Sequence, residues 1–121
     1  MIGWYNESLP RWLEHHGNMV VAFLHIDCDI YSSAAYVLSA LESRLAKNAV
    51  IVFDELINYP EYAQHELKAL LELQARTRRT VTVLGAGAPR LLGRTPQAIR
   101  AALKAQNGER QGHQSVAVVL V

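Results

Sequence analysis

The stretch FLHIDCDIYSS (residues 23–33) decides the predicted fold, because an apolar run ends there in two acids, Asp27 and Asp29. The run begins at Met19, and the apolar, β-branched segment MVVAFLHI (residues 19–26) is typical of a strand covered on both faces of a parallel sheet. Side chains two residues apart in an extended segment face the same side. The two carboxylates are therefore predicted to leave the end of this strand together.

Predicted strands and helices alternate along the rest of the chain. Three more apolar segments have strand character: AVIVF (49–53), TVTVL (80–84) and SVAVVLV (115–121). A short helix precedes the first strand, and a helix lies between each later pair of strands. This α-β-α-β-α-β-α-β order predicts an α/β fold with a mostly parallel sheet and right-handed crossovers.

The prediction of four helices is based on residues that favour helix starts and ends, and on apolar side chains at helical spacing. The signals are Ser8, Pro10 and Gly17 for the first helix, a cap at Ser32 or Ser33 for the second, Pro60 for the third, and Thr95, Pro96 and Asn107-Gly108 for the fourth. The stripes predicted to be buried are Ala34, Val37, Leu38, Leu41 and Leu45; then Ala63, Leu67, Leu70 and Leu71; then Ile99, Ala102 and Leu103.

Composition places the chain among ordinary globular proteins, and its length predicts one domain over residues 1–121. A net charge of +1, from 12 basic and 11 acidic residues, gives no electrostatic case for binding nucleic acid or a membrane surface. The longest apolar run, MVVAFL (19–24), is too short to span a bilayer, and the N-terminus shows no signal-peptide pattern. A single cysteine, Cys28, excludes an intrachain disulfide and agrees with a reduced, cytoplasmic setting.

A second pair of acids, Asp54 and Glu55, follows the second predicted strand. Ligands of open α/β sheets bind outside the carboxyl ends of the strands, so two parallel neighbours would gather all four carboxylates at one edge. Clustered carboxylates raise one another's pKa, and a hard divalent cation such as Mg²⁺ or Ca²⁺ offsets that cost. The alternative is that these acids cap helices or form turns.

Four segments together resemble a known family: GWYNESLP (3–10), HIDCDIYSS (25–33), VIVFDELINYP (50–60) and QHELKALLE (64–72). They are similar to the C-terminal half of class I S-adenosylmethionine-dependent O-methyltransferases, and most of all to the macrocin O-methyltransferase family, which acts on sugars of macrolides and related natural products. The resemblance covers residues 3–75 and the final QSVAVVLV (114–121). It implies the C-terminal portion of a Rossmann-like sheet, mostly parallel with a final antiparallel strand.

The resemblance implies a role for each acid and a methyl transfer from S-adenosylmethionine to a sugar or natural-product hydroxyl. Asp27 matches a Mg²⁺ ligand, and Asp54 and Glu55 match the pair that completes the metal site. The family more often has Asp at the position of Glu55, whose side chain is one methylene longer. Asp29 matches the proposed general base for the acceptor hydroxyl.

For several other side chains, a role in the site and a purely structural role are both considered. Tyr31 and Tyr59 line the substrate site or pack over the sheet edge. His25, inside the first strand, is predicted to be a hydrogen-bonded core histidine, and His65 either reaches the site or lies exposed on its helix. Cys28 is a conceivable thiolate nucleophile.

The resemblance does not extend to the cofactor-binding N-terminal half of the family. The glycine-rich segment VTVLGAGAPRLLG (81–93) has no acid just before it, so a circularly permuted cofactor site is only an alternative. S-adenosylmethionine is therefore expected to bind only if the missing half is supplied. The family's strand order, 3-2-1-4-5-7-6, would make the strand at residues 19–26 central, whereas here it is predicted to be an apolar edge.

An apolar edge strand invites pairing with another chain, so a homodimer or a complex with a separate N-terminal half is expected through residues 19–26. Two further functions stay open at this point. The chain could be a non-catalytic oligomerising or binding remnant of the fold, or a small metal-dependent hydrolase that uses the same carboxylates.

Overall fold

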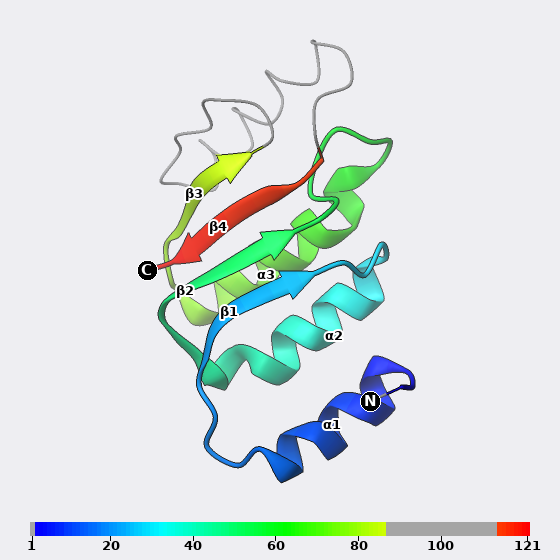
Figure 1. The fold of residues 1–121 in the computed structure, drawn as a ribbon. Coiled ribbons are helices and arrows are strands. Elements are labelled where there is room, and N and C mark those ends of the chain that lie inside the picture. Colours follow the sequence, from blue (N-terminus) through cyan, green and yellow to red (C-terminus); the bar gives the residue numbers. More distant parts are fainter. Residues whose placement is uncertain (1, 87–113) are drawn as a thin grey trace.

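A computed structural model describes residues 2–86 and 114–121 of the chain as an α/β arrangement (Figure 1). Its strands are β1 (Val21–Ile26), β2 (Leu45–Phe53), β3 (Val81–Ala86) and β4 (Val116–Leu120). Its helices are α1 (Tyr5–His15), α2 (Tyr31–Leu41) and α3 (Glu66–Thr77), with short 3-10 turns η1 (Glu42–Arg44) and η2 (Tyr62–Gln64). The predicted fourth helix, from Thr95 to Asn107-Gly108 with Pro96, Ile99, Ala102 and Leu103, lies outside the described residues.

The four strands form one mixed sheet in the order β1-β2-β4-β3. β1 pairs with β2 in parallel, whereas β4 runs antiparallel to both β2 and β3. β1, β2 and β3 therefore point the same way and the final strand inserts against them between β2 and β3. The predicted α/β class and the antiparallel last strand are both confirmed.

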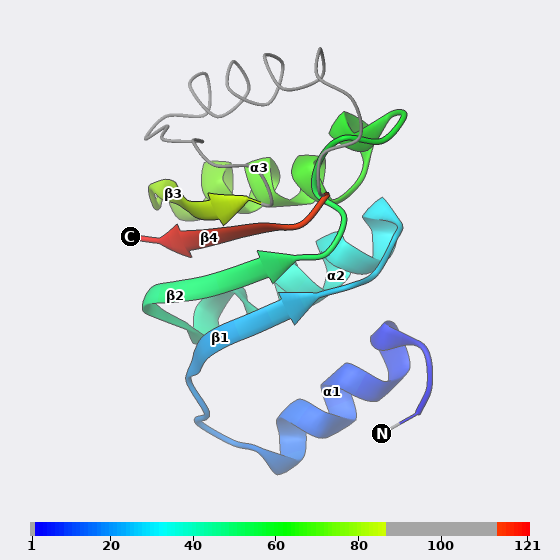
Figure 2. The same cartoon turned by 45° about the horizontal axis from the view of Figure 1, so that its top comes forward.

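Helices α2 and α3 lie side by side on one face of the sheet, and α1 lies against α2 beyond the β1 edge (Figures 1 and 2). The core lies between these helices and the sheet. Its strand side chains alternate along the pleat, as expected when one face is buried: Ala49, Ile51 and Phe53 from β2, and Val116, Val118 and Leu120 from β4. No helix among the described residues is long and apolar enough to cross a membrane.

β1 is the edge of this sheet, and it is not covered on both faces within the described chain. Ala22, Phe23 and His25 are exposed, and Leu24 is half-buried. The prediction of a core position for His25 is therefore wrong. An apolar run indicates a strand, but it does not show whether the strand is central or at the edge, since that depends on which other strands are present.

Three predicted helix starts are also wrong. α1 begins at Tyr5 and contains Pro10, which is tolerated because no residue of this helix is buried and water can hydrate the carbonyl that Pro10 leaves free. α2 begins at Tyr31 after Ile30, so neither Ser32 nor Ser33 is its cap. The predicted stripe of α2 is buried at Ala34, Val37, Leu38 and Leu41, but Leu45 belongs to β2.

α3 begins at Glu66, well after Pro60. Glu61 has a φ of 62°, in the left-handed region, and the turn η2 follows it, so the NYPEY segment cannot start a helix. Ala63 is consequently exposed rather than buried. Leu67 and Leu70 are buried as predicted, and Leu71 is half-buried.

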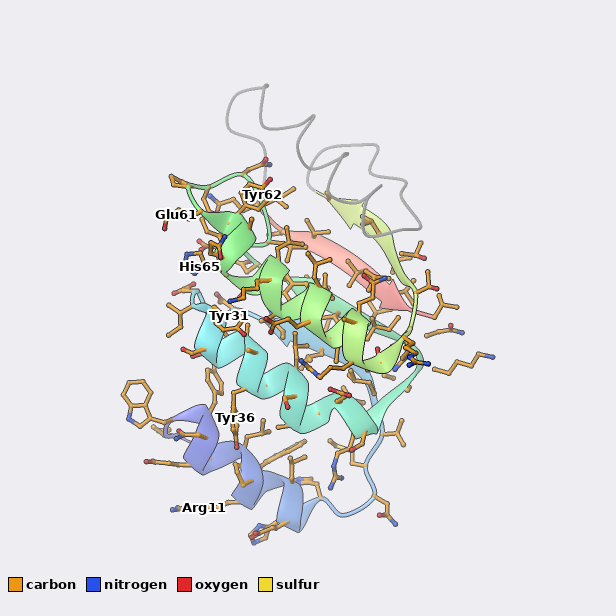
Figure 3. The ribbon with its side chains drawn as sticks, turned by 180° about the vertical axis from the view of Figure 1, so that it is seen from behind. Arg11, Tyr31, Tyr36, Glu61, Tyr62 and His65 are labelled. Carbon is orange, nitrogen blue, oxygen red and sulfur yellow. The ribbon has the colours of Figure 1, made fainter. Side chains whose placement is uncertain are left out.

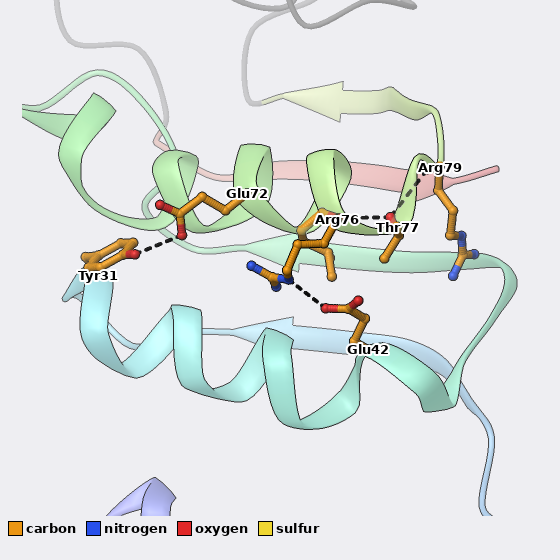
Figure 4. A network of polar contacts seen from close by, with 7 residues as sticks. Tyr31, Glu42, Glu72, Arg76, Thr77 and Arg79 are labelled. Carbon is orange, nitrogen blue, oxygen red and sulfur yellow. Dashed lines mark hydrogen bonds and ion pairs between the residues drawn. The ribbon is translucent and has the colours of Figure 1, made fainter.

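Polar contacts join α3 to its neighbours (Figure 4). The Tyr31 hydroxyl donates to Glu72 Oε2 at 2.8 Å, and Arg76 Nε donates to Glu42 Oε2 at 2.8 Å. Arg79, just after the helix, donates its guanidinium N–H groups to the main-chain carbonyls of Leu45, Ala46 and Leu120. A forked guanidinium suits this role, and it ties the start of β2 to the end of β4.

Candidate functional site

The two acid pairs follow neighbouring parallel strands at the same end of the sheet. Ile26 of β1 pairs with Phe53 of β2, and the N–H of Asp54 donates to the carbonyl of Ile26 at 2.9 Å. Asp27 and Asp54 are the next residues along each strand, so the register brings the first acid of each pair to the same level of the sheet. The structure thus places the four predicted acids at the carboxyl end of β1 and β2, as the parallel pairing of these strands implies.

The four side chains do not converge on one point as they stand. Asp27, Asp29 and Asp54 are exposed and Glu55 is half-buried. Among residues 2–86 and 114–121, no three His, Cys, Asp or Glu side chains lie close enough together to hold a metal ion. An ion shared by Asp27, Asp54 and Glu55 would therefore require these side chains to rotate, and exposed side chains such as Asp27 and Asp54 change rotamer rapidly.

Asp29 does not extend the strand. Its φ is 59°, in the left-handed region. The residues on either side of it are joined by a hydrogen bond, in which the N–H of Ile30 donates to the carbonyl of Cys28 at 2.6 Å. This tight turn leads directly into α2. The expectation that Asp27 and Asp29 face one side of an extended segment is therefore wrong, because β1 ends at Ile26. Asp is one of the few residues that tolerates this strained conformation, which is common at functional sites.

Glu66, the first residue of α3, is a fully buried acid next to the carboxyl end of β1, and the sequence analysis did not single it out. Its Oε1 accepts the N–H of Cys28 at 3.2 Å. Burial raises the pKa of Glu66 to about 7; the N–H groups of Cys28 and Glu55 oppose this rise, and the charges of Asp27 and Asp29 add to it. Its other oxygen, Oε2, has no hydrogen-bond partner among the described residues.

A sequence signal for Glu66 did exist. Ala69, Leu70 and Leu73 are buried, and they lie three, four and seven residues after position 66. That spacing puts Glu66 on the buried face of the helix. The signal was masked because the helix was predicted to start near Pro60.

Tyr59 lies close to the acids and Tyr31 does not contact them. Burial raises the pKa of Tyr59 to about 12, with further contributions from the charges of Glu66, Glu55 and Asp29. Its buried hydroxyl has no partner within the described part of the chain. Tyr31 instead lies between α2 and α3, where Lys68 Nζ is 4.2 Å from the centre of its ring.

His65 is the residue between η2 and α3, and Glu61 and Tyr62 lie just before it along the chain (Figure 3). Its ring centre is 5.8 Å from that of Tyr59. His65 is half-buried, and its Nδ1 has no hydrogen-bond partner among the residues described. Of the two readings of His65, the structure therefore favours a place beside Tyr59 over an exposed one.

A cavity of about 570 Å³ lies along β1, between that strand and α1. Its apolar lining includes Leu9 and Trp12 from α1, Phe23 from β1 and Leu41 from α2. Tyr5 and Cys28 both lie at its wall. Burial raises the pKa of the Cys28 thiol, which opposes its use as a thiolate nucleophile.

Comparison with known proteins identifies O-methyltransferases as structural neighbours. No protein-family model and no curated protein matches the chain. The apo structure of CalS11, a TDP-rhamnose 3'-O-methyltransferase of calicheamicin biosynthesis, superposes with a TM-score of 0.58 at 28% sequence identity, over 74% of this chain and 37% of that one. Another structure of CalS11, described as a calicheamicin methyltransferase, gives a TM-score of 0.57 at 28% identity, over 73% and 33%. The chain has an O-methyltransferase-like fold and spans about a third of the length of these neighbours.

Proposed function

We propose that this chain is the metal- and acceptor-binding part of an S-adenosylmethionine-dependent O-methyltransferase, corresponding to the C-terminal half of the macrocin O-methyltransferase family. The observation that carries the proposal is that adjacent parallel strands, β1 and β2, each end in an acid pair, in a chain whose structural neighbours are O-methyltransferases. The strand order β1-β2-β4-β3 agrees with the last four places, 4-5-7-6, of the order expected for that family. The proposed acceptor is a hydroxyl of a sugar or another natural product.

The donor set suits Mg²⁺, because that cation prefers carboxylate oxygens. Asp27, Asp54 and Glu55 would hold the ion, which would lower the pKa of a bound acceptor hydroxyl. Asp29 would take the proton from that hydroxyl as its oxygen receives the methyl group. Tyr59, whose buried hydroxyl has no hydrogen-bond partner among the described residues, would donate a hydrogen bond to an acceptor that reaches it.

A non-catalytic binding or oligomerising role is the second candidate. Within the described residues the acids do not converge on a metal position, and β1 presents a free apolar edge. Both observations are compatible with a remnant of the fold that pairs with other chains. Titration with Mg²⁺ separates the two candidates.

Asp27→Asn and Asp54→Asn are each expected to weaken Mg²⁺ binding by at least about tenfold, because each removes a charged ligand and keeps the size of the side chain. Isothermal titration of the purified chain measures the affinity. Glu14→Gln, which removes an exposed carboxylate from α1, is the matched control. Unchanged affinity in both Asp variants would contradict the metal assignment. The same titration with S-adenosylmethionine and Mg²⁺ tests whether the chain alone binds the methyl donor.

We also propose that the free edge of β1 pairs with another chain, either a second copy or a separate N-terminal half. Phe23 is 63% exposed on this strand, Val20 is 65% exposed just before it, and the apolar cavity lies alongside. An unpaired strand edge with exposed apolar side chains is a template for strand addition. A complementing strand would cover Phe23 and fill the free hydrogen-bonding edge.

Phe23→Lys is expected to weaken self-association by at least about tenfold, since a lysine on an edge strand disfavours strand pairing. Sedimentation equilibrium over a range of concentrations measures the association. Leu84→Lys is the matched control, because Leu84 is 57% exposed on β3, at the opposite edge of the described sheet. A wild-type chain that stays monomeric at every concentration would contradict the second-copy form of the proposal, and the N-terminal half would then be tested as the partner.

A further inference from the structure

One buried carboxylate, that of Glu66, lies between the two loops that carry the acid pairs. The N–H of Cys28 donates to Glu66 Oε1 at 3.2 Å. The N–H of Glu55 also faces the Glu66 carboxylate and lowers its pKa, but it forms no hydrogen bond as short as that of Cys28. These two contacts come from the loop after β1 and the loop after β2.

The two N–H groups occupy equivalent places in their loops. Cys28 is the residue after Asp27, and Glu55 is the residue after Asp54. Each N–H therefore belongs to the peptide group that directly follows the first acid of a pair. Holding both peptide groups on one carboxylate restricts the backbone of Asp27 and Asp54 together, and rigid support of this kind keeps ligands in position.

Glu66 is itself rigidly held. It is the first residue of α3, its side chain is 0% exposed, and its helix is anchored by the buried Ala69, Leu70 and Leu73. Burying a carboxylate costs free energy unless it is hydrogen-bonded, and an apolar side chain would fill the same space without that cost. Its acceptor capacity toward the two loops is the property that a leucine at this position would lack.

We propose that Glu66 is the positioning residue of the carboxylate site, holding the loops that bear Asp27 and Asp54 at a fixed separation. It does so through the N–H groups of Cys28 and Glu55 and does not itself bind the ion. The proposal rests on the proposed function, because it assigns Glu66 a role in the same Mg²⁺ site. It adds a residue from α3 to a site otherwise built from the ends of β1 and β2.

The test compares three variants of the whole chain. Glu66→Leu removes both acceptor oxygens, whereas Glu66→Gln keeps one carbonyl oxygen for the Cys28 N–H. Leu73→Ala is the matched control, because Leu73 lies on the same helix and is also 0% exposed. It is expected to lower the stability of the chain while leaving the carboxylate of Glu66 in place. Amide hydrogen exchange of Cys28 and Glu55 by NMR, referenced to amides of β2, reports the loops, and titration with Mg²⁺ reports the site.

Glu66→Leu is expected to lower the exchange protection of both amides, and the Mg²⁺ affinity, each by at least about tenfold relative to Leu73→Ala. Glu66→Gln is expected to restore the protection of Cys28. Equal protection in Glu66→Leu and Leu73→Ala would overturn the proposal, and so would lost protection with unchanged Mg²⁺ affinity. Absence of Mg²⁺ binding by the wild type would contradict the proposed function, whereas the exchange measurement would still decide whether Glu66 holds the two loops.

Discussion

A Glu66→Gln variant is expected to be more stable than the wild type at pH 8, by up to roughly 3 kcal/mol, and to lose this advantage towards pH 5. Burial raises the pKa of Glu66 from 4.5 to about 7, and each pKa unit corresponds to about 1.4 kcal/mol. The folded chain therefore holds this proton more tightly than the unfolded chain does. The stability that Glu66 contributes is complete below about pH 4.5 and is lost as the pH rises through about 7.

Glutamine is neutral throughout this range, so the variant avoids the cost of a buried charge beside Asp27 and Asp29. Urea denaturation of both proteins at several pH values between 5 and 8 gives the difference in the free energy of unfolding. Glu61→Gln removes an exposed carboxylate from the segment before α3 and is the matched control. The prediction would be contradicted if the difference in the free energy of unfolding between the wild type and Glu66→Gln stayed constant from pH 5 to pH 8.

The strands and the apolar stripe of α2 could be predicted because their signals are local. A continuous apolar run indicates a strand whatever surrounds it, and the spacing of Ala34, Val37, Leu38 and Leu41 defines a helix face. The exposure of His25 could not be predicted in this way. It depends on β1 being the edge of the described sheet, which is a property of the whole arrangement of strands.

The helix starts were missed because backbone conformation at single residues decides them. Glu61 takes a left-handed φ of 62°, which is uncommon for a glutamate, and Asp29 takes one of 59°. Left-handed residues of this kind carry weak sequence signals. The shift of the third helix from Pro60 to Glu66 had a direct consequence, since it concealed the buried acid beside the candidate site.

The placement of the four acids was predictable because it needs only two parallel neighbouring strands. The pairing of Ile26 with Phe53 supplies that condition, and the acids follow. The orientation of their side chains was not predictable, because it depends on the turn at Asp29 and on the buried contacts of Glu66. Local pattern therefore locates this site along the chain, whereas tertiary contacts shape it.

Asp29→Asn is expected to slow methyl transfer by about 10²- to 10⁴-fold, the usual contribution of a general base. Asparagine has nearly the shape of aspartate but cannot take the proton of the acceptor hydroxyl. It also tolerates the left-handed φ of 59° at this position, so the melting temperature should stay close to that of the wild type. A loss of rate without a loss of stability is therefore the signature of the proposed role.

The assay follows formation of S-adenosylhomocysteine from S-adenosylmethionine with Mg²⁺ and TDP-rhamnose, the sugar nucleotide named for the structural neighbour CalS11. Glu61→Asn is the matched control, because Glu61 is an exposed acid that also has a positive φ, of 62°. It makes a similar change of charge and backbone preference outside the four acids, so its rate should equal that of the wild type. An Asp29→Asn rate within about threefold of the wild type would remove Asp29 as the base. A different outcome would count against the proposed function: no turnover by the wild type when its cofactor half is supplied and other hydroxyl acceptors are also tried. The methyl donor, the metal and the base would then all be in place without a reaction.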